Sequence, residues 1–162
     1  MLAVCLAAGL GAVGCGGGSH TYKAGTPAVT GVPPDCSVVP LDLFKKLLKL
    51  DVTGPLVDTT KPHTTICTFP HGVGGGGAVE QVRITGDETP ENFHRVRDGL
   101  KAANNPVKKI GGWGDEAYAA AVHFVVVENN FAVRKGQVSV AIQSTADFDG
   151  IKKLMKEILK SI

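Results

Sequence analysis

The sequence predicts a domain of half-buried strands covered on one face by helices, and two patterns carry this prediction. Apolar and polar residues alternate along residues 78–85 and 131–142, as they do in strands with one face in a core. Large apolar side chains recur at spacings of three and four along residues 148–162, opposite a lysine-rich face. Burying each of them stabilises a fold by about 1.5–3 kcal/mol. We therefore expect this amphipathic C-terminal helix to pack on the sheet.

The N-terminal residues 1–14 form an uncharged, apolar run that is too short to span a membrane. Its length fits the apolar region of a signal peptide. The run ends in Ala12-Val13-Gly14-Cys15, and glycines follow at once. This junction resembles the lipobox of bacterial lipoproteins, in which lipid, commonly palmitate among the acyl chains, is attached to the cysteine. We expect residues 1–14 to be a lipoprotein signal peptide and Cys15 to be the lipid attachment site. An ordinary secretory signal, or a disordered N-terminus with a chance cysteine, is the alternative.

Residues 15–34 are predicted to be a flexible tether. Glycine, threonine and proline dominate this stretch, so it buries too little apolar surface to offset its ordering entropy. The remaining residues, 35–162, are enough for one extracytoplasmic domain with a sizeable core. We expect the protein at the outer face of the cytoplasmic membrane, in the cell envelope.

Charge and composition exclude some partners. The chain has 17 Lys and Arg against 15 Asp and Glu, a net charge of +2. A protein that binds nucleic acid usually presents a strongly basic face, so no nucleic-acid partner is expected. Aromatic residues make up 6%, which argues against an aromatic platform for sugars or bases. We expect a monomer whose partners are the membrane, through the anchor, and an envelope protein or lipid ligand.

The four cysteines divide into three roles. Cys5 would leave with the signal peptide and Cys15 would carry lipid, so Cys36 and Cys67 remain as a pair. Disulfides form and persist in exported domains, and two cysteines allow one pairing. We predict a Cys36–Cys67 disulfide worth roughly 3–4 kcal/mol. A redox-active pair is the alternative, but the spacing of such pairs, Cys-x-x-Cys, does not occur.

Two helices are predicted before the closing one. Residues 40–50 place leucines and Phe44 on one face and lysines on the other, and Gly54-Pro55 follows. Thr89-Pro90 supplies a cap residue and a proline at the first helical position, which predicts a helix over residues 89–103. The residues expected on its apolar face are Phe93, Val96 and Leu100.

Strands are predicted at residues 64–69 and 78–85, joined by a flexible glycine-rich connection at 71–77. Strand-like runs follow at 117–122 and 123–128. The chain then either turns at Asn129-Asn130 or continues as a bent strand. Lys135-Gly136 predicts a hairpin turn, because glycine accepts a positive φ.

The histidines do not show a metal-ligand spacing, so neither a metal nor a cofactor is expected. They are His20, His63, His71, His94 and His123. His63 and His71 flank the same strand and could meet in a weak metal site, which we consider the minor alternative. His123 is expected to be partly buried and hydrogen-bonded. The glycines after His71 do not form a phosphate loop, since neither Lys-Ser nor Lys-Thr follows them.

The segment 111–116 holds the only tryptophan, Trp113, and a pair of acids, Asp115 and Glu116. Adjacent residues of an extended chain point to opposite faces, so these carboxylates are not expected to form a facing acid–base pair. Trp113 is interpreted as a packing anchor and its glycines as turn formers. We therefore predict that the chain has no catalytic residues and is not an enzyme.

Several short motifs together resemble a known family. They are the lipobox-like Cys15, Pro34-Asp35-Cys36, Ile66-Cys67-Thr68-Phe69, Gly112-Trp113-Gly114-Asp115-Glu116-Ala117-Tyr118 and Val133-Arg134-Lys135-Gly136-Gln137-Val138. Their order resembles small actinobacterial, mycobacterial-type cell-envelope lipoproteins of unknown function, similar to the LpqN-like and PsbP-like lipoproteins. The resemblance implies an α+β domain with an antiparallel β-sheet flanked by helices. It implies no catalytic residues.

Three functions are compatible with these patterns. The leading hypothesis is a lipid-anchored lipoprotein that acts as a non-enzymatic binding or interaction module. The alternative is a lipid or small-molecule carrier with an apolar cleft between sheet and helix, which a cavity of about 300–1,000 Å³ would favour. The third, an envelope hydrolase, requires histidines or acids that converge within hydrogen-bond reach. The lysine-rich face of the closing helix is expected to be solvated, with contact to anionic lipid headgroups as the alternative.

Overall fold

The structure is a computed structural model that describes residues 35–72, 79–123 and 126–162. The predicted signal peptide, the lipid attachment site Cys15, the tether and the glycine run 74–77 lie outside the described residues. None of the helices in the described ranges is long and apolar enough to cross a membrane.

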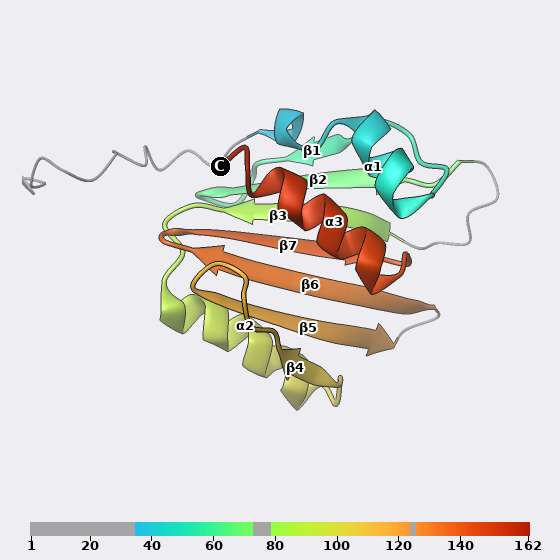
Figure 1. The fold of residues 1–162 in the computed structure, drawn as a ribbon. Helices are drawn as coiled ribbons and strands as arrows, with labels where there is room; N and C mark the ends of the chain where they lie inside the picture. The colour runs from blue at the N-terminus through green and yellow to red at the C-terminus, as the bar shows by residue number, and fades with distance from the viewer. Residues whose placement is uncertain (1–34, 73–78, 124–125) are drawn as a thin grey trace, which may run out of the picture.

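The described chain contains one antiparallel sheet of seven strands, in the order β1-β2-β3-β7-β6-β5-β4 (Figure 1). The strands are β1 (Leu56–Asp58), β2 (Thr64–Pro70), β3 (Val79–Thr85), β4 (Val107–Lys109), β5 (Glu116–His123), β6 (Val127–Lys135) and β7 (Val138–Ser144). Most neighbours are joined by hairpins, but β7 pairs with β3, 62 residues apart at Gln81 and Gln143. The short edge strands β1 and β4 were not predicted.

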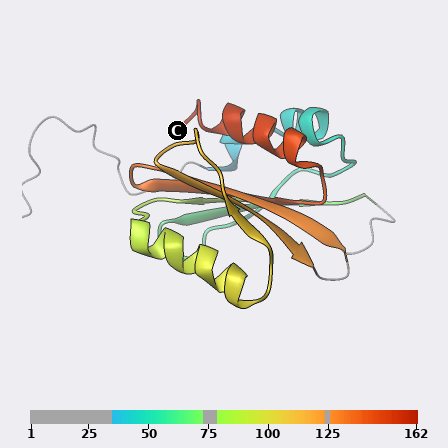
Figure 2. The same cartoon turned by 60° about the horizontal axis from the view of Figure 1, so that its bottom comes forward.

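Helices cover both faces of the sheet. The short 3-10 helix η1 (Cys36–Val38), α1 (Leu41–Leu48) and α3 (Phe148–Ile158) lie on one face, and α2 (Pro90–Ala102) lies on the other (Figure 2). The predicted α+β fold, with the C-terminal helix packed on an antiparallel sheet, is therefore confirmed. α2 lies beside β4 and β5, so it covers the end of the sheet that α1 does not reach.

The layer between the sheet and α1 and α3 is filled with large side chains. Phe44 of α1 stacks on Phe69 of β2 with ring centroids 4.1 Å apart. The fully buried members of this layer include Phe131, Ile142, Ile151, Leu154, Met155 and Ile158. These side chains occupy the space in which the sequence allowed an apolar cleft.

The first turn of α2 has the predicted cap. Thr89 Oγ1 accepts a hydrogen bond from the backbone N–H of Asn92 at 3.1 Å, and Pro90 opens the helix. Phe93 is buried against Tyr118 with ring centroids 5.1 Å apart. The expectation for Val96 is wrong, because its side chain is 47% exposed and the buried stripe runs instead through Phe93 and the half-buried Arg97.

The second half of the sheet differs from prediction at one turn. Asn129 and Asn130 lie within β6, and the chain reverses before Val127. Asn129 pairs with Ala121 of β5 and Ser144 of β7, and its Nδ2 also donates to the carbonyl of Ala146 at 2.8 Å. The predicted hairpin at Gly136 is confirmed, with φ of 61°. His123, expected to be partly buried, is exposed at the end of β5.

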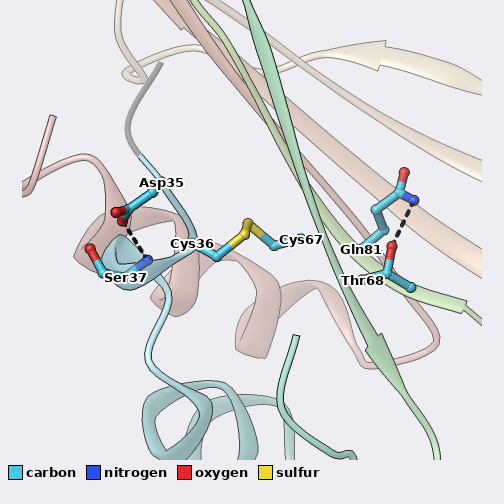
Figure 3. Close-up of a disulfide and its surroundings, with 6 residues drawn as sticks. All are labelled: Asp35, Cys36, Ser37, Cys67, Thr68 and Gln81. Atoms are coloured by element: carbon cyan, nitrogen blue, oxygen red, sulfur yellow. Dashed lines mark hydrogen bonds between the residues drawn. A yellow bond between two sulfur atoms is a disulfide. The ribbon is translucent and has the colours of Figure 1, made fainter. Parts of the chain in front are cut away.

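The predicted Cys36–Cys67 disulfide is present, with an S–S distance of 2.08 Å and a Cα–Cα distance of 5.7 Å. Figure 3 shows Cys67 pointing from β2 toward η1, whereas the next residue, Thr68, lies beside Gln81 of β3. Cys67 is fully buried, so the bond ties the start of the domain to the sheet through the core.

Removing the disulfide is expected to destabilise the domain without changing the sheet. The double variant Cys36→Ser/Cys67→Ser should lose roughly 3–4 kcal/mol of unfolding free energy, because a loop of 31 residues is no longer closed in the unfolded chain. Urea unfolding followed by Trp113 fluorescence measures the difference. Wild-type protein under reducing conditions is the control and should match the variant; an unchanged midpoint in both would contradict the prediction.

Candidate functional site

The loop between β4 and β5 is shaped by two glycines on either side of Trp113. Gly112 and Gly114 have φ of 79° and 51°, in the left-handed region that glycine accepts. A Cβ on Gly114 would lie 2.3 Å from the carbonyl oxygen of Arg134, so only glycine lets the loop approach β6 this closely. Trp113 packs edge-on against Phe131, with ring centroids 5.1 Å apart. The interpretation of Trp113 as a packing anchor and of its glycines as turn formers is confirmed.

Arg134 of β6 holds this loop by its guanidinium group. Nη1 lies 3.2 Å from Asp115 Oδ2 and donates to the carbonyl of Gly136 at 2.8 Å. Nη2 donates to Glu116 Oε1 at 3.0 Å, and the N–H of Gly136 donates to Asp115 Oδ2 at 2.8 Å. Both carboxylates therefore bind the same guanidinium group, although strand alternation alone would point them to opposite faces. Asp115 precedes β5 and follows a left-handed glycine, so strand alternation begins only at Glu116.

His94 extends the cluster to α2. Its Nε2 is in hydrogen-bond contact with Glu116 Oε2, while the other carboxylate oxygen accepts from Arg134. The hydrogen bond to His94 and then the one to Arg134 hold the pKa of Glu116 below its ordinary value of 4.5, so this carboxylate is ionised at neutral pH. The four residues His94, Asp115, Glu116 and Arg134 are called the charge cluster below.

A small cavity of about 270 Å³ lies between α2 and the sheet, beside the charge cluster. Its lining residues are Phe93, Arg97, Lys109, Ile110, Gly111, Asp115, Glu116, Ala117 and Tyr118. Burial raises the pKa of the Tyr118 hydroxyl to about 12, so this group stays protonated. The lining contains neither serine, threonine nor cysteine, the usual nucleophiles of hydrolases.

Two other histidines also lie against acids. His63 Nδ1 is 2.9 Å from Asp87 Oδ2, and His71 Nε2 is 3.0 Å from the fully buried Glu80. Glu80 also accepts from Thr145 Oγ1 at 2.6 Å, so it links His71, which follows β2, to Thr145, which follows β7. The minor alternative, in which His63 and His71 meet in a weak metal site, is contradicted by their positions. They stand at opposite ends of β2, eight residues apart, which separates them by about 26 Å at roughly 3.3 Å per residue.

A larger, open groove of about 710 Å³ lies where the β4–β5 loop, the β6–β7 turn and the C-terminal end of α3 meet. Its lining residues are Gly112, Trp113, Gly114, Asp115, Lys135, Lys156, Leu159 and Lys160. We call it the Trp113 groove. Lys160 Nζ is 2.7 Å from Glu157, whereas Lys135 and Lys156 make neither an ion pair nor a side-chain hydrogen bond with the other described residues. Asp115, the single acid in the lining, is already bound by Arg134.

The groove thus combines half-buried apolar side chains, Trp113 and Leu159, with lysine ammonium groups at its rim. Such a surface suits a ligand with an apolar body and a negative group. Among the described residues, groups of three or more His, Cys, Asp or Glu that could hold a metal ion are absent.

Sequence reasoning singled out Trp113, Asp115 and Glu116 but missed the residues they work with. Arg134 and His94 lie 18 and 22 residues from Glu116, and Lys156 belongs to another element. One signal in the sequence was Arg134, directly before the Lys135-Gly136 hairpin. The end of β6 pairs with the start of β5, so Arg134 lies opposite Glu116.

The chain has no match among protein families, curated proteins or solved structures. The functional assignment therefore depends on the residues and their geometry.

Neutralising Glu116 should lower the free energy of unfolding at neutral pH. It should also remove the part of the stability that the wild type loses in acid. Because the folded pKa of Glu116 lies below the unfolded value, its contribution is present above about pH 4.5 and is lost as the pH falls through the folded pKa. Glu116→Gln should cost about 1–2 kcal/mol at pH 7, in the range of a hydrogen bond to a charged group, and progressively less as the pH falls through the folded pKa. Denaturant unfolding at several pH values measures this difference.

The matched control is Glu91→Gln, which changes an exposed glutamate in the first turn of the same α2 that carries His94. It should change stability by less than about 0.5 kcal/mol. A pH-independent cost for Glu116→Gln would contradict the assignment of its pKa to the charge cluster.

Proposed function

We propose that this chain is a lipid-anchored protein of the cell envelope that acts as a non-enzymatic binding module, and that the Trp113 groove is its binding site. The observation that carries the proposal is the groove itself. It is open, it is lined by the sole tryptophan, and two of its lysines have no side-chain partner among the described residues. Exposed lysines beside half-buried apolar groups favour capture of a ligand rather than packing within the domain.

The state of the charge cluster supports binding over catalysis. Each carboxylate of the cluster is bound by Arg134, and the cluster joins a loop, two strands and a helix. A general acid or base works best with a pKa near the operating pH. Glu116 has a lowered pKa and Tyr118 a pKa of about 12, so neither is suited to exchange a proton at neutral pH.

The hydrolase hypothesis keeps one element of support, because three histidines do lie within hydrogen-bond reach of acids. These pairs lie at separate places in the fold, and the cavity beside His94 has no nucleophile in its lining. The carrier hypothesis is less well supported, since the described layer between the sheet and α3 is filled by buried aromatic and aliphatic side chains.

The proposed anchor makes a direct prediction. Cells that express the chain and are fed an alkyne fatty acid should produce labelled protein, and Cys15→Ala should abolish the label. Cys36→Ala removes a cysteine that the structure places in the disulfide and is the matched control, so its label should persist. Label that survives Cys15→Ala would overturn the anchor.

The proposed binding site is tested by photo-cross-linking in intact cells. A photoreactive amino acid in place of Lys135, at the rim of the groove, should yield a defined adduct. The same amino acid in place of Lys108, an exposed lysine on β4 outside the groove lining, should not. Equal adducts from both positions would contradict a role for the groove. Loss of the adduct in the Cys15→Ala background would show that location selects the ligand.

A further inference from the structure

The Trp113 groove and the start of the described chain lie at the same end of the molecule. In both views η1, where the described chain begins, lies beside the C-terminal end of α3 and on the side of the β4–β5 loop (Figures 1 and 2). The described chain therefore begins on the side of the domain that carries the β4–β5 loop and the end of α3.

The polarity of the groove fits a negatively charged partner. Lys135, Lys156 and Lys160 approach it from two elements, the β6–β7 turn and α3. Two acids lie nearby and both are paired: Asp115 with Arg134, and Glu157 with Lys160. Lys135 and Lys156 thus leave the rim with positive charge that the surrounding described side chains do not compensate.

We propose that the Trp113 groove binds the phosphate headgroup of an anionic phospholipid in the membrane that carries the anchor. This inference rests on the proposed function, because the anchor would bring this end of the domain close to the bilayer. Ammonium groups of Lys135 and Lys156 bind the phosphate, and Trp113 and Leu159 contact the glycerol and upper acyl region. Tryptophan favours this interfacial position, where one side is apolar and the other is wet.

The groove contact would add a second attachment to the lipid anchor. A single lysine near an anionic leaflet binds weakly, but several on one surface add together, and a tethered domain meets the headgroups at high effective concentration. The anchor holds the protein at the membrane, and the groove orients the domain so that the β4–β5 loop and the end of α3 face the bilayer.

The test uses the full chain as Cys15→Ala and water-soluble, short-chain lipids as probes. Dihexanoyl-phosphatidylglycerol is titrated while the emission of Trp113, the only tryptophan, is recorded. We expect a saturable shift of the emission. The double variant Lys135→Gln/Lys156→Gln should weaken the apparent affinity about tenfold or more. Both side chains are exposed, so unfolding midpoints should stay unchanged and confirm that the variant folds.

The matched control is Lys108→Gln/Lys153→Gln, which removes the same charge from one strand and from α3 at exposed positions outside the groove lining. It should weaken binding less than about twofold. Equal weakening by both double variants would overturn the site, because only the net charge would then matter.

Two further probes identify the source of the phosphate. Dihexanoyl-phosphatidylcholine, which has the same chains and a zwitterionic headgroup, should bind more weakly than phosphatidylglycerol. Equal binding of the two lipids, or the same response to inorganic phosphate alone, would overturn the anionic-lipid assignment. A non-lipid adduct at position 135 in cells, together with failure of these titrations, would reject this inference and leave the binding module intact.

Discussion

The guanidinium group of Arg134 lies where separate parts of the chain meet, and the surface around the Trp113 groove depends on it. It binds Asp115 in the β4–β5 loop, Glu116 at the start of β5 and the carbonyl of Gly136 in the next hairpin. Through Glu116 it also reaches His94 on α2. Arg134 is 9% exposed; its Nη1 and Nη2 atoms have carboxylate and carbonyl acceptors, whereas its buried Nε has no hydrogen-bond partner among the described residues. Asp115 and Glu116 thus compensate the charge of the buried guanidinium. Gly114 lets the loop approach β6 closely, which places Trp113 against Phe131 of the core.

Much of the fold could be predicted because its signals are local. The cap at Thr89, the hairpin glycine at Gly136 and the apolar spacing of α3 each act within a few residues. The failures are non-local. Asn129 resembles a turn residue, but pairing with β5 on one side and β7 on the other places it in a strand. Val96 fits helical spacing, yet α2 covers only the β4–β5 end of the sheet and leaves that side chain exposed.

The local part of the candidate site could be predicted from the sequence, and the part that depends on distant elements could not. Trp113, Asp115 and Glu116 stand next to one another and drew attention as a motif. Their partners come from α2, β6 and α3, and only the strand register brings these together. Strand alternation, a local rule, even misplaced Asp115, because it does not hold for the residue that precedes a strand after a left-handed glycine.

The strand order also governs how the chain can assemble. β7 lies between β3 and β6, so the group β1–β2–β3 and the group β4–β5–β6 share no neighbouring strands and are joined in the sheet only through residues 138–144. Until that strand is made, β3 and β6 each present an open backbone edge. Pairing across long sequence separations is slow, and open edges favour association between chains. A protein synthesised from its N-terminus therefore completes this sheet only after β7 has emerged.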